Sequence, residues 1–217
     1  MGVNDRNKHR FEAMWPLPYG VSYNSYLIDD EMVALVDTVD ICYFEVYLRK
    51  IKQVIGERPI NYLIINHMEP DHCAMIGDLV RRYPEVQVVG NTKTFGMIKQ
   101  FFGTDFAERA VTVKEGDTLA TGAHTLHFVM APMVHWPEVM TAYEETEKIL
   151  FSADAFGRFG ALERTARAPW APQARRYYYN IVGKYGAQVQ ALLKKAAGLE
   201  IEMICPLHGP VWRKDIA

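Results

Sequence analysis

The chain has 217 residues, with 24 Lys and Arg against 26 Asp and Glu, a formal net charge of −2 and 49% hydrophobic residues. This length suits a single domain, which we expect to cover residues 1–217. The near-neutral charge, without a basic block, argues against nucleic acid as a partner. No apolar run approaches the ~20 residues of a membrane span, and the N-terminus lacks the apolar stretch of a signal peptide. We therefore expect a cytoplasmic protein that does not enter a membrane.

Hydrophobic periodicity predicts a mixed α/β chain. Strands are expected at 25–28, 32–36, 60–65, 86–89, 110–113, 124–130, 139–143, 149–152 and 202–204. Helices are expected at 44–55, 73–82, 92–102 and 174–197. Hairpins come first, then strands and helices alternate, and then more hairpins follow. This order favours two sheets with helices outside them.

The informative segment is 66–72, which follows an apolar strand and precedes a helix. It holds four metal-competent side chains, His67, Glu69, Asp71 and His72. In an extended strand end, residues two apart point to the same side. We therefore expect the first three together and His72 on the other side, an arrangement that can serve two adjacent metal ions.

Three more candidates follow strands later in the chain: His135, Asp154 and His208. Imidazoles mixed with carboxylates and without a thiolate suit iron or manganese better than a structural zinc site. The seven divide into two His and one carboxylate per metal plus one bridging carboxylate. Three carboxylates and a bridging hydroxide would balance two ferrous ions in a buried site.

Any one of these residues alone is more often a cap or a hydrogen-bonded core residue, so only the seven together indicate a metal centre. His9, His124 and His127 match no ligand pattern and are expected to have no special role. The three cysteines, Cys42, Cys73 and Cys205, form no C-x-x-C pair, and we expect reduced thiols. Cys73 and Cys205, beside ligand candidates in sequence, are expected to pack in the fold. Tyr177, Tyr178 and Tyr179 are expected to pack in the core or at an interface.

The spacing His67-x-Glu69-x-Asp71-His72, with three ligand candidates downstream, resembles the metallo-β-lactamase-like domain of flavodiiron proteins. The resemblance covers nearly the whole chain, with similar segments at 20–28, 35–40, 151–157 and 208–213. It implies an αββα sandwich with the metals at one edge between the two sheets. Hydrolases of this fold usually carry His where Glu69 stands, and the exchange of imidazole for carboxylate shifts the site from zinc toward iron.

By position, the resemblance implies one iron on His67, Glu69 and His135, and another on Asp71, His72 and His208. Asp154 would bridge them together with a solvent-derived oxo or hydroxo group. Family members reduce dioxygen to water or nitric oxide to nitrous oxide at this site. We therefore expect a non-haem diiron oxidoreductase acting on O2 or NO, and the family also implies a homodimer.

Flavodiiron proteins continue into a flavodoxin domain that binds FMN. This sequence has no Ser/Thr- and Gly-rich phosphate loop after a strand, so we expect no FMN on this chain. Electrons would then come from a separate donor such as a rubredoxin or a flavodoxin. A second departure is Cys73-Ala74, where many family members have Ser-Gly.

Two other functions remain open from the sequence. One is a non-catalytic diiron protein that binds or senses O2, which the missing flavin domain favours. The other is a dizinc or mixed-metal hydrolase of the same fold that uses a metal-bound hydroxide on an ester, thioester or phosphodiester. Glu69 counts against the hydrolase.

Overall fold

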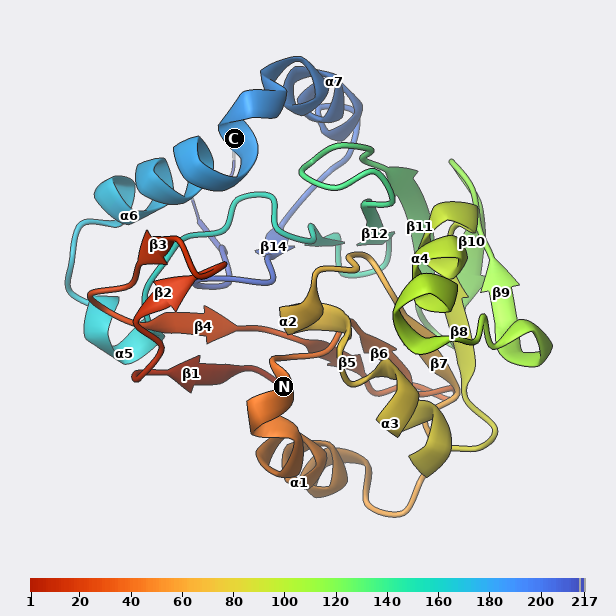
Figure 1. Ribbon diagram of the computed structural model, residues 1–217. Coiled ribbons are helices and arrows are strands. Elements are labelled where there is room, and N and C mark those ends of the chain that lie inside the picture. Colours follow the sequence, from red (N-terminus) through yellow and green to blue (C-terminus); the bar gives the residue numbers. More distant parts are fainter. Residues whose placement is uncertain (215, 217) are drawn as a thin grey trace.

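The computed structural model describes residues 1–214 and 216. Two five-stranded sheets pack face to face, and helices cover both outer faces (Figure 1). This arrangement confirms the predicted αββα sandwich. Within these residues, no helix is both long and apolar enough to cross a bilayer.

The first sheet is mostly parallel. Its strands in spatial order are β5 (Tyr26–Ile28), β6 (Ala34–Val36), β7 (Tyr62–Ile64), β8 (Gln87–Gly90) and β9 (Ala110–Thr112). Only β5 and β6 are antiparallel, so the other pairs need crossovers. These crossovers carry α1 (Phe44–Ile55), α2 (Pro70–Cys73), α3 (Ile76–Arg82) and α4 (Thr92–Phe102).

The second sheet is mostly antiparallel, with β10 (Thr118–Ala120), β11 (Thr125–Met130), β12 (Met140–Glu144), β13 (Ile149–Phe151) and β14 (Met203–Cys205) in spatial order. β14 runs parallel to β13. The crossover between them holds α5 (Leu162–Thr165), α6 (Trp170–Tyr177), a π-helical segment (Tyr178–Val182) and α7 (Gly186–Ala196). Short 3-10 helices lie at Ile41–Tyr43, Ala107–Arg109 and Gly183–Tyr185.

The N-terminal residues form two small antiparallel pairs beside the sandwich. β1 (Val3–Asp5) pairs with β4 (Val21–Tyr23), and β2 (Arg10–Phe11) pairs with β3 (Trp15–Pro16). These strands, and β10, were not predicted from the sequence.

Side chains alternate between two cores along each strand of the first sheet. In β6, Ala34 and Val36 face Leu126 and Phe128 of the second sheet, while Leu35 belongs to the core under the helices. The same alternation in β7 and β8 places both faces of these strands in apolar surroundings. Strands β6, β7 and β8 are therefore buried on both faces, and this packing holds their carboxyl ends in place.

Two predicted helices were wrong in extent. The helix expected at 73–82 is two helices, α2 and α3, which meet at residues 74 and 75. The helix expected at 174–197 begins at Trp170 after Pro169 and is interrupted between α6 and α7. Gly183 and Gly186 lie at this interruption, and glycine weakens a helix interior.

Candidate metal centre

All seven candidate ligands lie together at one edge of the sandwich, and none is more than 8% exposed. His67 and Glu69 follow β7, and Asp71 and His72 are in α2. The other three come from the second sheet: His135 from the loop between β11 and β12, Asp154 after β13 and His208 after β14. Strand ends of both sheets thus converge on one buried site.

His67, Glu69, His135 and Asp154 form the first group. Nε2 of His135 lies 3.2 Å from Nε2 of His67 and 3.1 Å from Oε2 of Glu69. Oδ2 of Asp154 is 3.2 Å from the same His135 atom and 3.7 Å from Nε2 of His67. Atoms bound about 2.1 Å from one ion at tetrahedral angles are ~3.4 Å apart, so the spacing fits a shared metal ion.

Asp71, His72 and His208 form the second group. The Nε2 atoms of His72 and His208 are 3.0 Å apart, and Oδ2 of Asp71 lies 3.6 Å from the first and 3.5 Å from the second. Oδ1 of Asp154 is 3.5 Å from Nε2 of His72 and 3.7 Å from Nε2 of His208. Asp154 therefore turns one oxygen toward each group.

The expected alternation along 66–72 was wrong for Asp71. The backbone is extended only as far as Glu69, and Pro70 begins α2 at the position where helices accept proline. The helical turn then brings Asp71 beside His72 rather than beside His67 and Glu69.

Hydrogen bonds from outside the two groups orient two of the four imidazoles, those of His67 and His208. Nδ1 of His67 lies 2.9 Å from Oε1 of Glu138, which also accepts the backbone N–H of Met68 at 2.8 Å. Nδ1 of His208 lies 2.7 Å from the backbone oxygen of Ser22. When Nδ1 of each ring donates a hydrogen bond, Nε2 carries no proton. The Nε2 lone pair then points at the other candidate ligands of the same group.

Two buried carboxylates beside the site were missed by the sequence analysis. Glu138 lies three residues after His135, and this spacing was its only signal. Asp37 follows β6, and its Oδ1 accepts the backbone N–H groups of Asn66 and His67 at 2.8 and 3.1 Å. Burial raises the pKa of Asp37 to about 7. Asp37 lies in the segment 35–40 that carries the family resemblance, but strand pattern alone gave it no role.

Charges within the site shift the protonation of its members strongly. Burial alone would raise the pKa of Asp154, but His208, His135 and His72 hold it well below its usual range. Burial would lower the pKa of His72, but Asp71 and Asp154 raise it to about 9. Burial raises the pKa of Asp71 to about 7 and lowers that of His208 to about 4. Acidic and imidazole groups thus depend on each other for charge balance.

Several acceptors in the site have no hydrogen-bond donor. Both carboxylate oxygens of Asp71 and Oδ1 of Asp154 are buried without a partner among residues 1–214 and 216. Unpaired buried acceptors are costly. Together with the facing Nε2 lone pairs, they fit a donor set for two cations.

Comparison with known proteins identifies the family. Residues 21–209 match the family model described as ODP family beta lactamase. The chain belongs to this family.

A nitric oxide reductase of Moorella thermoacetica is 33% identical over 204 residues, which cover 90% of this chain and 51% of that protein. The rubredoxin oxygen:oxidoreductase of Desulfovibrio gigas has a TM-score of 0.91 and 32% identity, over 98% of this chain and 54% of that one. The flavodiiron protein of Giardia intestinalis has a TM-score of 0.92 and 30% identity, over 99% and 53%. The resemblance to flavodiiron proteins is therefore confirmed. The chain spans 37–55% of the length of the curated relatives that it matches.

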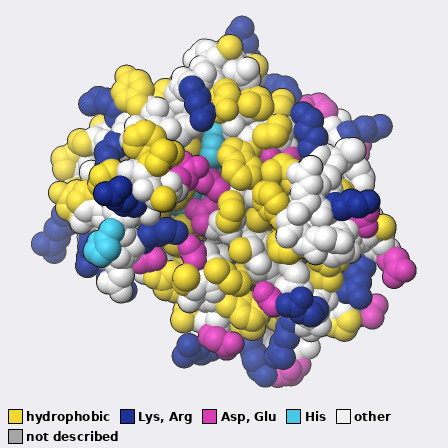
Figure 2. Space-filling model, in the orientation of Figure 1, with side chains coloured by type: hydrophobic (Ala, Val, Ile, Leu, Met, Phe, Trp, Pro, Cys, Tyr) yellow, Lys and Arg dark blue, Asp and Glu magenta, His cyan; other side chains and the backbone are white. Residues whose placement is uncertain are grey.

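Aromatic rings surround the metal centre of this ODP-family chain. The ring of Trp136 lies 5.5 Å from that of His67, and the rings of Phe11, Tyr23 and Tyr177 lie 5.3–5.7 Å from that of His208. Figure 2 shows acidic side chains and a histidine at the centre of this face, between hydrophobic side chains. The aromatic rings exclude water from the histidine side of the site.

The tyrosine run at 177–179 divides between core and surface. Tyr177 is buried, as expected, while Tyr178 and Tyr179 are 38% and 69% exposed. One further carboxylate, Glu12 in the turn between β2 and β3, is exposed and lies beside Glu69. Burial, followed by the charge of Glu69, raises the pKa of Glu12. The sequence analysis did not single out Glu12.

The remaining histidines and cysteines lie outside the two groups. His124 pairs with Asp30 at 2.8 Å and His127 with Glu145 at 2.7 Å. His9 is exposed. The thiol of Cys73 donates to the backbone oxygen of Met68 at 3.1 Å, which suits a packing residue beside the ligands.

Proposed function

We propose that this chain holds two iron ions in the two groups and reduces dioxygen to water, or nitric oxide to nitrous oxide, with electrons from a separate donor. The observation that carries the proposal is the position of Asp154, with Oδ2 toward His67 and His135 and Oδ1 toward His72 and His208. A carboxylate between two ligand groups is the arrangement that a bridged metal pair needs. The names of the Moorella and Desulfovibrio relatives support the gas-reducing chemistry.

His67, Glu69 and His135 would hold one iron, and Asp71, His72 and His208 would hold the other. Two ferrous ions bound there would supply electrons and open coordination positions for a diatomic gas. Three carboxylates and one hydroxide would balance the charge of these ions, which a site with this degree of burial requires. Glu69 favours iron over zinc because it adds a hard oxygen ligand where the hydrolases have imidazole.

The chain itself would contribute orientation and shielding. Glu138 and the Ser22 carbonyl hold the His67 and His208 rings by their Nδ1 atoms, so Nε2 cannot turn away. The rings of Trp136, Phe11 and Tyr23 form an apolar wall, which strengthens electrostatic interactions inside. A rubredoxin or flavodoxin as donor, a homodimer and a cytoplasmic location remain predictions of the sequence.

The proposal is tested on protein prepared without oxygen, by metal analysis and by optical spectra after addition of O2 and, separately, of NO. We expect two irons per chain, a spectrum that responds to the gases, and consumption of the gas when electrons are supplied. Two zinc ions with an inert spectrum would favour the hydrolase. An optical change that reverses without consumption of O2 would favour the sensor.

Asp154→Ala tests the bridge. We expect this variant to keep its circular dichroism spectrum and to lose one or both irons, because both groups lose an oxygen ligand. A variant that retains two irons per chain with unchanged reactivity would show that the ligand assignment is wrong.

A further inference from the structure

Charge is unevenly distributed along the chain. Residues 162–198, which include α5, α6 and α7, hold seven Lys and Arg and one Glu. The rest of the chain then holds 17 Lys and Arg against 25 Asp and Glu. A near-neutral total thus conceals a basic segment, and segregated charge of this kind attracts partners of opposite sign.

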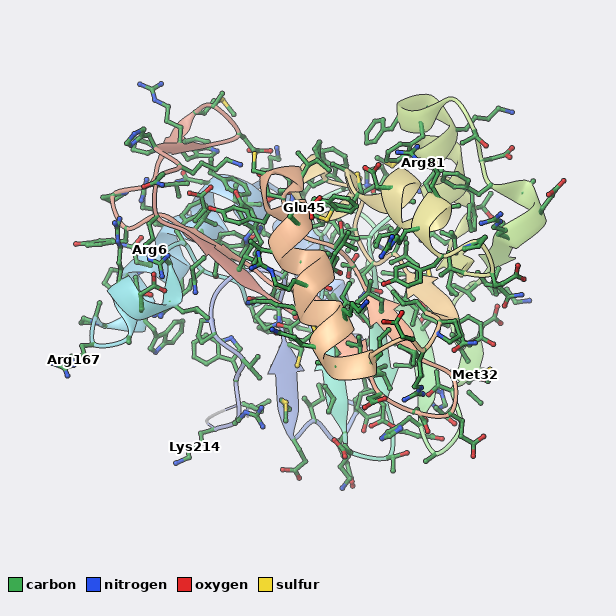
Figure 3. All side chains as sticks on the ribbon, turned by 90° about the horizontal axis from the view of Figure 1, so that it is seen from below. Arg6, Met32, Glu45, Arg81, Arg167 and Lys214 are labelled. Carbon is green, nitrogen blue, oxygen red and sulfur yellow. The ribbon has the colours of Figure 1, made fainter. Side chains whose placement is uncertain are left out.

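Six basic side chains of residues 162–185 and of β2 have no carboxylate partner in the described part of the chain, and we call them the basic face: Arg10, Arg164, Arg167, Arg175, Arg176 and Lys184. The N-terminal hairpin joins it to α6, because Arg10 pairs with Pro16 in the sheet and the Pro16 carbonyl accepts a hydrogen bond from Arg176. Figure 3 shows Arg167 extending into solvent at one edge, across the molecule from Arg81 on α3.

Large aromatic side chains are exposed on the same segment. Trp170, the first residue of α6, is 55% exposed, and Tyr179 is 69% exposed. Arg, Trp and Tyr are the residues most enriched at the energetic centres of protein interfaces. The segment therefore combines positive charges, which attract an acidic partner, with exposed aromatic side chains, which can pack against that partner after contact.

Two aromatic rings lie between Arg176 of the basic face and a ligand of the candidate metal centre. The guanidinium of Arg176 lies 5.4 Å from the ring of Phe159, which lies 5.0 Å from the ring of Tyr177. Tyr177, at the end of α6, in turn lies 5.7 Å from the ring of His208. A molecule docked on α6 would be close to one group of ligands.

We propose that the basic face is the docking site of an acidic redox protein that delivers electrons to this centre, an inference that rests on the proposed function. Each docked donor would be oxidised by one electron. Four such deliveries and four protons from solvent would convert one O2 to two waters, and two of each would convert two NO to one N2O and one water. The donor class is a compact protein with a negative surface around its iron–sulfur or flavin group.

A nucleic acid or an anionic membrane also binds arginine and aromatic side chains. The compact protein is favoured because the rest of the chain carries an excess of carboxylates, which would repel an extended polyanion. A small acidic protein can contact the basic face alone.

The test is a calorimetric titration of the protein with an oxidised, acidic rubredoxin at low and at high ionic strength. This binding measurement needs neither gas nor turnover. The variant is Arg167→Glu with Arg175→Glu, since both side chains are exposed and carry no ion pair among the described residues. The matched control is Arg49→Glu with Arg82→Glu, which makes the same charge change on exposed residues of α1 and α3.

We expect the basic-face variant to bind rubredoxin about 10-fold or more weakly at low salt, and the control to bind within about twofold of the wild type. The difference should shrink at high salt. The docking proposal fails if rubredoxin does not bind, if both variants bind equally, or if a DNA duplex or an anionic phospholipid vesicle binds more tightly than rubredoxin.

Gas consumption driven by a small chemical reductant separates this proposal from the proposed function. If the wild-type protein consumes gas with the chemical reductant but does not bind rubredoxin, the docking site alone is overturned. Intact rubredoxin binding without chemical turnover would overturn the diiron function and leave a docking surface whose electron acceptor must be sought elsewhere.

Discussion

Glu138 lies outside the candidate ligand set but holds one of its members in place. One oxygen of this buried carboxylate accepts both from the His67 ring and from the Met68 backbone. It therefore fixes the His67 ring and the loop that carries it at the same time. Removing such an orienting partner typically weakens metal binding by about 10–100-fold.

We predict that Glu138→Ala weakens metal binding by about this factor while the fold is retained. The measurement is competition for the metal with a chelator of known affinity. Glu145→Ala is the control, because this exposed carboxylate pairs with His127 away from the site and should leave the affinity unchanged. Equal affinities for the two variants would mean that Glu138 has no orienting role.

At the residue scale, sequence spacing and family resemblance singled out the seven side chains that the structure brings together. The side on which Asp71 lies was not predictable from strand alternation, because Pro70 ends the extended backbone. Glu138 and Asp37 were missed because their roles depend on contacts between segments 29 to 71 residues apart, which no local pattern encodes.

At the scale of elements, Asp30 connects the two sheets at the loop between β5 and β6. Its carboxylate accepts from Thr121, from the backbone N–H groups of Ala123 and His124, and from the His124 ring at 2.8 Å. The hydrogen bond to Asp30 raises the pKa of His124 above 6.5. Burial would raise the pKa of Asp30, but the His124 ring and the backbone donors hold it well below its usual range.

These shifts predict a pH-dependent stability. Because the pKa of His124 is higher in the folded state, the ring contributes its full stabilisation to the fold below pH 6.5, the pKa in the unfolded state. This stabilisation is lost as the pH rises through the pKa of the folded state. The lowered pKa of Asp30 means that its contribution is present above 3.8 and is lost as pH falls through the folded value. The ion pair of Asp30 and His124 should therefore stabilise the fold most between pH 3.8 and pH 6.5.

We predict that His124→Ala lowers the midpoint of urea unfolding more at about pH 5.5 than at about pH 8.5. His127→Ala is the control. This ring, on β11, pairs with Glu145, which is more exposed than Asp30. A loss for His124→Ala that is the same at both pH values would contradict the assigned ion pair.

Two helices with a regular apolar period were predicted most accurately. The helices 44–55 and 92–102 were predicted with the bounds that the structure has, because each shows a full apolar period and ends at a glycine with positive φ, Gly56 or Gly103. The α6–α7 region was predicted as one helix although Gly183 and Gly186, which weaken a helix interior, lie within it. Tyr177, the last residue of α6 before the interruption, lies 5.7 Å from the ring of His208, a tertiary contact that no local pattern encodes.

At the scale of the whole molecule, the candidate metal centre joins the two sheets. The first sheet supplies His67 and Glu69 to one group and Asp71 and His72 to the other, while the second sheet supplies His135, Asp154 and His208. Bound metal would cross-link the halves of the sandwich. Without it, three carboxylates and four imidazoles must balance their charges inside a buried site.

Metal removal should therefore destabilise the whole fold rather than only the site. A ligand that binds only the folded state at 100 times its Kd adds about 2.7 kcal/mol to the free energy of unfolding, so two ions at such concentrations would add about 5 kcal/mol. We predict that chelation under anaerobic conditions lowers the urea midpoint, with one transition reported by both circular dichroism and tryptophan fluorescence.

Asp154→Ala separates this effect from a general action of the chelator. Because both groups lose an oxygen ligand, the variant should gain less than half of the wild-type stabilisation when ferrous iron is added. His9→Ala, an exposed histidine outside the groups, should gain the full amount. If metal addition moved the midpoint equally in all three proteins, the ions would be binding outside this centre, and the cross-link between the two sheets would lose its support.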